Sequence, residues 1–208
     1  MAHLSVPIDI QGLKVAEETS DASPMLPQVV PAVLAGLLAD DALISLDCGA
    51  HTVFCARHLR MRGNQQLALA GNHTTMGPGL PYTIAAQLAF PGRQVVACVG
   101  DGGFTMMMPE LLTAVKYRLP ITVVVFKNNS LAHVIYEQLD EGYKEFGLDL
   151  QPLDFVKYVE ACGAAGVRCS SRSEVRPALE AALHSKRPAV VEAVVASHVN
   201  PAKPDKYG

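Results

Sequence analysis

The stretch that decides the fold is "VVACVGDGGFTMMMPELL", residues 95–112. It opens with an apolar run in which polar and apolar residues do not alternate, which is typical of a strand buried on both faces of a parallel sheet. The run ends at Gly100-Asp101-Gly102-Gly103, where an acid stands between glycines. Burying a lone carboxylate is costly, so we expect Asp101 to meet a cation.

Other apolar runs share this character and alternate with segments of helical spacing. We expect strands at 43–46, 94–99, 121–126 and 189–195, with a weaker one at 166–169. We expect helices at about 27–39, 51–60, 79–90, 108–118, 131–141, 152–162 and 173–185. This alternation predicts an α/β fold with a doubly wound, mostly parallel sheet and helices on both faces.

The first 23 residues have a different character. The segment "AHLSVPIDIQGLKV" is strand-like with a proline, and "AEETSDAS" is a polar connection that does not favour a helix. We expect residues 1–23 to form an appendage and linker, and residues 24–208 to form the main domain.

Composition narrows the class of partner. The chain has 208 residues, a formal net charge of -3 and five cysteines, none of them in a C-x-x-C pair. This charge does not indicate a nucleic-acid-binding protein, and these cysteines do not indicate a fold stabilised by disulfide bonds. No apolar run reaches the roughly 18 residues that a membrane span needs, and the N-terminus lacks the pattern of a signal peptide. We expect a cytoplasmic protein that binds small molecules or other proteins.

Three loops that follow predicted strands carry the polar residues of interest. They are 47–51, 100–103 and 127–130, and the carboxyl ends of parallel strands meet at one rim, where ligands bind. Carboxylate and amide oxygens suit Mg²⁺ or Ca²⁺ rather than zinc. One Asp and one Asn are too few to hold Mg²⁺ alone. A diphosphate would complete the shell, with open backbone amides at Gly49, Gly102 and Gly103.

The spacing of these residues resembles a known motif. Gly100-Asp101-Gly102 is followed, 27 residues after the aspartate, by Asn128 in "KNNS". This resembles the thiamine-diphosphate motif of the pyruvate oxidase and acetolactate synthase superfamily, and it runs from one strand end to the end of the next strand. The likeness covers about residues 24–200, which corresponds to the C-terminal, diphosphate-binding domain of that superfamily.

The resemblance implies roles for the residues of the motif. Asp101 and Asn128 would ligate Mg²⁺ through their side chains, and Ser130 through its carbonyl. His51 would contact the diphosphate together with the amides that follow Gly100. Taken alone, Asp101 also suits a turn or helix cap, and His51 an ordinary cap or surface residue.

Two further segments resemble parts of the family's site. In "GNHTTMGPGLP", residues 71–81, the Thr74 carbonyl would accept from the aminopyrimidine, and Met76 would be the apolar wedge that keeps the cofactor bent. Glu137 matches a glutamate of pyruvate oxidases that faces cofactor and substrate, and it is the candidate catalytic residue; a solvated helix position is the alternative. Lys127 and His133 depart from the family pattern, which usually has Asn and, in oxidases, often Phe there.

The resemblance implies a thiamine-diphosphate and Mg²⁺ dependent enzyme that decarboxylates pyruvate or a related 2-oxo acid, of oxidase or dehydrogenase type. The family's pyrimidine-binding domain and its central domain, which binds FAD in oxidases, have no counterpart in this sequence. We therefore expect no turnover without a partner chain, and a homo-oligomer. An acetolactate synthase-like carboligase component and a non-catalytic cofactor-binding or assembly module remain alternatives.

Two other classes of protein fit the sequence poorly. A phosphohydrolase would need Asp-x-Asp after the first strand, where this chain has Asp47-Cys48-Gly49. A dinucleotide-binding protein would need the motif G-x-G-x-x-G. The glycine pairs Gly77-x-Gly79 and Gly100-x-Gly102 do not continue in that way.

Overall fold

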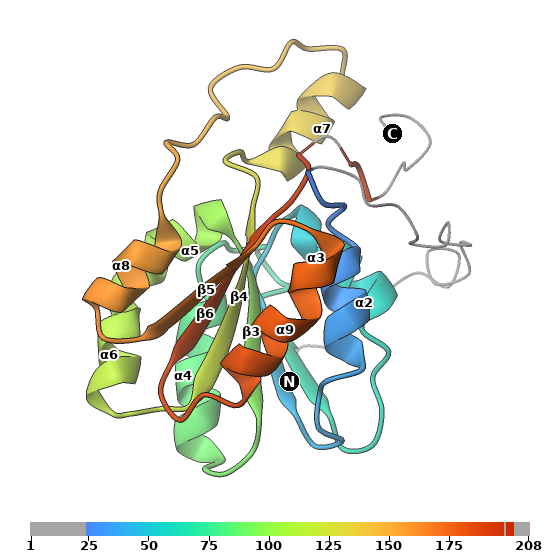
Figure 1. Ribbon diagram of the computed structural model, residues 1–208. Coiled ribbons are helices and arrows are strands. Elements are labelled where there is room, and N and C mark those ends of the chain that lie inside the picture. The colour runs from blue at the N-terminus through green and yellow to red at the C-terminus, as the bar shows by residue number, and fades with distance from the viewer. Residues whose placement is uncertain (1–23, 198, 202–208) are drawn as a thin grey trace.

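The computed structural model describes residues 24–197 and 199–201 (Figure 1). A six-stranded sheet with strand order β2-β1-β3-β4-β6-β5 forms the centre, and every pairing between neighbouring strands is parallel. The strands are β1 Leu43–Leu46, β2 Gln66–Leu69, β3 Val95–Gly100, β4 Ile121–Lys127, β5 Ala165–Cys169 and β6 Ala189–Val194. The α/β fold predicted from the sequence is confirmed.

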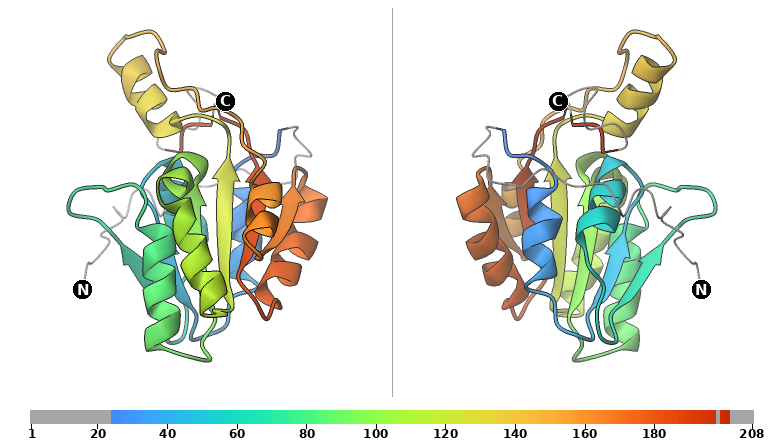
Figure 2. Two further views of the ribbon diagram at one scale, coloured as in Figure 1. Left: turned by 90° about the vertical axis from the view of Figure 1, so that its left-hand side faces the viewer. Right: turned by 90° about the vertical axis from the view of Figure 1, so that its right-hand side faces the viewer.

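Helices cover both faces of the sheet, which explains why the central strands are mostly apolar, without alternation of polar and apolar residues. In chain order they are α2 Val29–Ala35, α3 Ala50–His58, α4 Gly79–Ala89, α5 Asp101–Met107, the 3-10 turn η1 Met108–Glu110, α6 Leu111–Lys116, α7 Ala132–Asp140, α8 Phe155–Ala161 and α9 Arg172–Leu183. Helices α2, α3 and α9 lie on one face, and α4, α5, α6 and α8 on the other (Figures 1 and 2). Each face has its own buried apolar cluster.

The strand order changes direction next to β1. From β1 the chain crosses outward to β2 and then returns to β3 on the other side of β1. The loops that leave β1 and β3 therefore diverge at their carboxyl ends. In open α/β sheets this is the place where ligands bind.

The structure differs from the predicted elements in three places. Strand β2 was not predicted, because it is a short edge strand in which more and less exposed residues alternate. The helix expected at 108–118 starts at Asp101 instead, since Asp101 begins α5 directly after β3, and Pro109 lies in the η1 turn that separates α5 from α6. Helix α2 is shorter than the expected 27–39.

Two further sequence predictions concern the N-terminal segment and membrane-spanning helices. The predicted appendage and linker, residues 1–23, lies outside the described residues. Within residues 24–197 and 199–201, none of the helices has the length and apolar character to cross a membrane.

Candidate functional site

An open pocket with a cavity volume of about 70 Å³ lies at the carboxyl ends of β1, β3 and β4. It brings together most of the residues that the sequence singled out. Those on its wall are Gly49, His51, Met76, Gly100, Asp101, Gly102, Gly103, Asn128 and Ser130. Thr74 and Glu137 are not part of this wall.

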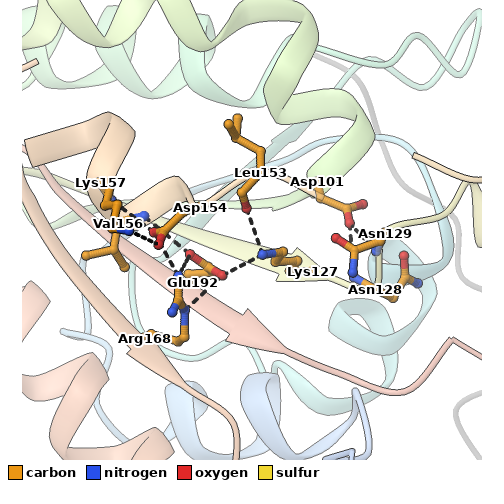
Figure 3. A network of polar contacts seen from close by, with 10 residues as sticks. All are labelled: Asp101, Lys127, Asn128, Asn129, Leu153, Asp154, Val156, Lys157, Arg168 and Glu192. Atoms are coloured by element: carbon orange, nitrogen blue, oxygen red, sulfur yellow. Dashed lines mark hydrogen bonds and ion pairs between the residues drawn. The ribbon is translucent and has the colours of Figure 1, made fainter. Parts of the chain in front are cut away.

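Asp101 joins the β3 loop to the β4 loop. It is the first residue of α5 and is only 4% exposed. Its Oδ2 accepts from the backbone N–H groups of Asn128, at 3.0 Å, and Asn129, at 2.6 Å, while Oδ1 accepts from the Gly102 N–H at 2.9 Å. The Gly102 amide is therefore engaged by Asp101 rather than open. Figure 3 shows the Asp101 carboxylate directed at the Asn128–Asn129 backbone.

The pKa of Asp101 is raised above its ordinary value. Burial is the largest cause, and the hydrogen bonds from the Asn129, Gly102 and Asn128 backbones lower the pKa without cancelling the effect of burial. A nearby cation would oppose this rise by stabilising the charged form. The arrangement is therefore suited to a cation bound beside Asp101.

The loop that follows β4 folds around Asn128. The Asn128 Oδ1 atom accepts from the Ser130 N–H at 3.0 Å and from the Ser130 hydroxyl at 3.2 Å. Asn129 has a φ of 56°, a left-handed conformation that Asn tolerates better than most residues. Asn128 thus lies beside Asp101, but its amide oxygen is directed at its own loop. Rotation of the Ser130 hydroxyl would free one acceptor position on that oxygen.

His51 is a buried imidazole with an unsatisfied nitrogen. It is 6% exposed, packs against Phe126 with ring centroids 5.7 Å apart, and has no hydrogen-bond partner at Nε2. Burial, the largest cause, lowers the pKa of His51 to about 4. A hydrogen bond with the Asp47 backbone raises it and the charge of His133 lowers it further. The side chain is therefore neutral near pH 7.

Glycines leave room around this imidazole. A Cβ at Gly49 would stand 3.1 Å from His51 Nδ1, and one at Gly100 would stand 3.2 Å from the same atom. Gly49 also has a φ of 151°, which side chains rarely adopt. Both positions need glycine for His51 to reach the pocket wall.

Met76 reaches the same pocket from the loop that precedes α4. A Cβ at Gly102 would lie 3.3 Å from Met76 Cε and 2.7 Å from Leu131 Cδ2. The glycine thus allows an apolar side chain from each neighbouring loop to close over the start of α5. Met76 therefore lies on the pocket wall beside the start of α5.

Asp47 is a residue whose part in the site sequence reasoning missed. It is fully buried, and its Oδ1 accepts from the N–H groups of Cys48, at 2.8 Å, and Gly77, at 2.7 Å. Its Oδ2 has no hydrogen-bond partner, and burial raises its pKa. Asp47 therefore fixes the Met76-Gly77 turn against β1. The available signal was its position, because Asp47 ends an apolar strand before a glycine just as Asp101 does.

Thr74 and Glu137 lie on the exposed side of the site. Thr74 is exposed and has a φ of 46°, and the Glu137 side chain is 66% exposed. Glu137 Oε1 lies 3.7 Å from His133 Nε2, and His133 does line the pocket. Glu137 also acts electrostatically on Cys48, another residue of the pocket wall, and helps to raise the pKa of its thiol, for which burial is the largest cause.

The donor set of the pocket fits a hydrated hard cation and an anion better than zinc. Across the described residues, no group of three or more His, Cys, Asp and Glu side chains gathers in a way that would hold a metal ion. The side-chain oxygens that the loops after β3 and β4 bring to the pocket wall are the Asp101 carboxylate, the Asn128 amide and the Ser130 hydroxyl, and oxygen ligands suit Mg²⁺ shared with a phosphate group. The unsatisfied His51 Nε2 is a ready partner for such a ligand on the opposite wall.

Comparison with known proteins agrees with this geometry. Residues 47–193 match the family model described as "Thiamine pyrophosphate enzyme, C-terminal TPP binding domain". A Bacillus subtilis protein, YdaP, described as thiamine pyrophosphate-containing, is 44% identical over 92% of this chain and 33% of its own length.

Two further relatives have enzyme names. An acetolactate synthase of Bacillus subtilis is 31% identical over 75% of this chain and 27% of its own length. A pyruvate oxidase of Lactiplantibacillus plantarum is 32% identical over 74% of this chain and 26% of its own length. The chain thus spans about a third of the length of these relatives or less. It belongs to the thiamine pyrophosphate enzyme family and corresponds to the C-terminal thiamine pyrophosphate-binding domain of that family.

Proposed function

We propose that this chain binds thiamine diphosphate through Mg²⁺, as the C-terminal part of an enzyme that decarboxylates pyruvate or a related 2-oxo acid. The observation that carries the proposal is the contact between Asp101 and the backbone of Asn128 and Asn129 at one pocket. This contact brings Asp101 and the loop that begins 27 residues later, at Asn128, to the wall of the same pocket.

Asp101, Asn128 and Ser130 would hold the metal ion. Asp101 supplies the negative charge, and the hydrogen bonds from the loop after β4 keep its carboxylate in a fixed orientation before any ion arrives. Fixing the orientation in advance lowers the entropic cost of binding. Thiamine diphosphate itself, when bound, supplies the nucleophilic carbon and the electron sink for decarboxylation.

His51 would donate or accept a hydrogen bond at the diphosphate through Nε2. Because the imidazole is buried, a bound anion beside it would favour its protonated form and raise its pKa. Met76 and Leu131 exclude water from the start of α5, which strengthens the electrostatic contacts inside the pocket. The side-chain environment therefore suits an anionic group that is partly withdrawn from solvent.

The oxidase or dehydrogenase type is the version we favour. It is supported by the glutamate at position 137 and by the pyruvate oxidase among the relatives. An acetolactate synthase-like carboligase component is the second candidate, supported by the acetolactate synthases among the relatives.

Turnover would need protein that this chain does not supply. The relatives are about three times as long as this chain, and Thr74 and Glu137 are not among the residues of the pocket wall. We propose that a pyrimidine-binding domain from a partner chain or from another part of a longer protein completes the site, in a homo-oligomer. Decarboxylation of pyruvate by the purified chain alone would contradict this part of the proposal, and failure with every partner domain would favour a non-catalytic binding module.

A cytoplasmic location is also part of the proposal. All five cysteines are free, as expected of a protein from a reducing compartment.

Thermal unfolding tests the choice of ligand. We expect thiamine diphosphate with Mg²⁺ to raise the Tm and inorganic pyrophosphate with Mg²⁺ to raise it less. Thiamine without phosphate should leave the Tm unchanged, because the contacts identified above address the diphosphate end. A Tm that responds equally to thiamine and to thiamine diphosphate would refute the proposed site.

A further inference from the structure

Glu192 on β6 is a buried carboxylate that the proposed site does not use. Its side chain is 0% exposed. It accepts from Lys127 Nζ at 2.9 Å, from Arg168 Nε at 3.0 Å and from Arg168 Nη2 at 3.1 Å. Figure 3 shows this network lying next to Asp101 and the start of the Asn128 loop.

Two of the partners of Glu192, Lys127 and Val156, lie at the two ends of one segment that leaves the sheet and returns to it, and Arg168 lies on the neighbouring strand β5. Lys127 is the last residue of β4, where the chain leaves the sheet, and Lys127 Nζ also donates to the Leu153 carbonyl at 2.7 Å. The Val156 N–H, in the first turn of α8 where the chain returns, donates to Glu192 Oε2 at 3.3 Å. Residues 128–154, here called the α7 arm, therefore leave and return at the same carboxylate.

The two legs of the α7 arm are paired just above this point. The Leu131 N–H donates to the Leu148 carbonyl at 2.9 Å, and the Leu150 N–H donates to the Asn129 carbonyl at 2.8 Å. Beyond this neck, α7 and its following loop stand away from the sheet (Figure 2). The arm is thus a narrow projection whose position depends on few contacts at its base.

The inner side of the α7 arm forms one wall of the pocket. The arm residues on that wall are Asn128, Ser130, Leu131, Ala132, His133, Val134 and Tyr136. A shift of the base would displace all of them together. The Tyr136 hydroxyl, which donates to the Ser197 carbonyl at 2.6 Å, holds the arm at a second place.

The stability of the fold alone does not account for the charged groups at the base of the α7 arm, which are Glu192, Lys127 and Arg168. A buried ion pair contributes little more than well-packed apolar side chains of the same size, but it demands defined geometry from every partner. Here the partners belong to β4, β5 and α8. The Glu192 pKa is nevertheless lowered, because the Arg168 and Lys127 hydrogen bonds outweigh the raising effect of burial, which is the largest single cause.

We propose that Glu192 is a positioning residue that anchors both ends of the α7 arm through Lys127 and Val156, and thereby sets the pocket wall that the arm forms. Its consequence for cofactor affinity rests on the proposed function. The anchoring itself does not, because it concerns contacts within the chain.

Amide hydrogen exchange of the full chain without cofactor tests the anchoring. In Lys127→Met, we expect peptides covering 128–154 to exchange about tenfold faster or more, because hydrogen bonds to a charged group at the base are lost. Peptides covering β5 and β6 should change little, since Arg168 still pairs with Glu192. Lys127→Arg should restore most of the protection. Lys186→Met, at an exposed position before β6, is the matched control.

Glu192→Gln should also speed exchange in the arm, and in β5 as well, because it weakens the pair with Arg168. Adding Lys127→Met to it should change the arm little further, because the contact between Lys127 and Glu192 is already weakened. Unchanged exchange in the arm of Lys127→Met would overturn the proposal. So would an equal increase along the whole chain, which would indicate a role in global stability only.

Affinity for thiamine diphosphate with Mg²⁺ is the second measurement. Lys127→Met should bind about tenfold more weakly than the unaltered chain if the arm sets the pocket wall. Faster hydrogen exchange in the α7 arm with unchanged affinity for thiamine diphosphate would overturn the claim that the arm sets the pocket wall. The claim that Glu192 anchors the arm would still stand. If the unaltered chain fails to bind the cofactor, the proposed function fails, while the exchange data still decide the anchor.

Discussion

Replacing His51 should change how stability depends on pH. Burial lowers the pKa of His51 to about 4, from 6.5 in an exposed histidine. Above pH 6.5 the imidazole is neutral in both the folded and the unfolded chain, so its contribution does not change with pH. Between 6.5 and about 4 only the unfolded chain takes up the proton, so stability falls as the pH falls.

The size of the effect follows from the two pKa values. Their separation corresponds to about 3 kcal/mol in the free energy of unfolding, reached once the pH is below both values. Between about pH 7.5 and about pH 4.5, roughly 2.5 kcal/mol of this should be lost. Because the side chain is 6% exposed, solvent screening reduces this figure little.

Urea unfolding at these two pH values measures the effect. His51→Asn removes the titrating group, so this variant should lose about 2.5 kcal/mol less than the unaltered chain on acidification. Any constant cost of the substitution cancels in the comparison. His184→Asn, at an exposed position, should behave like the unaltered chain. Equal losses in the unaltered chain and in His51→Asn would refute the assignment of a buried, neutral imidazole.

Three further substitutions test the packing around the pocket. Gly103→Ala would place a methyl group 2.1 Å from Asp47 Oδ2 and should lower the free energy of unfolding by about 2–3 kcal/mol in urea. Gly71→Ala, at a position with open space around it, is the control and should change stability little. Equal effects of the two substitutions would contradict the close packing of Gly103 against Asp47. Asp47→Ala leaves the Gly77 N–H without its acceptor and should lower stability by about 1–2 kcal/mol, because relief of the buried, unsatisfied carboxylate oxygen offsets part of the loss. Retention of full stability would show that the contact is unimportant. Met76→Ala should lower the free energy of unfolding by about 1 kcal/mol or less. It should weaken the binding of thiamine diphosphate, measured by calorimetry, about tenfold. Unchanged affinity would show that Met76 is not part of the binding site.

The central strands were predictable because their physical situation is simple. β3, β4 and β6 are covered by helices on both faces, so their sequences are mostly apolar without alternation, with Thr122 and Glu192 as buried exceptions. The edge strand β2 has half-exposed residues and only four positions, and its sequence carries no comparable signal. Local sequence therefore predicts the strands whose burial is uniform and misses the strand at the edge.

The site was predictable only where spacing along the chain identifies it. Asp101 and Asn128 follow two neighbouring strands, so their approach could be inferred from the parallel sheet. The contacts of Asp47 with Gly77 and of Glu192 with Lys127 join positions 30 and 65 residues apart, and no local pattern marks them. Glu137 was identified by family position, and its side chain is 66% exposed, so burial does not mark it as part of the site.

Calorimetric titration with thiamine diphosphate tests the central claim most directly. The account predicts binding in the presence of Mg²⁺ that is lost when the metal is chelated. It also predicts loss of this binding in Asp101→Ala, with the fold of the variant verified by circular dichroism. Binding of the same affinity without Mg²⁺ and in Asp101→Ala would contradict the claim that Asp101 and the Asn128 loop hold a metal ion and a diphosphate.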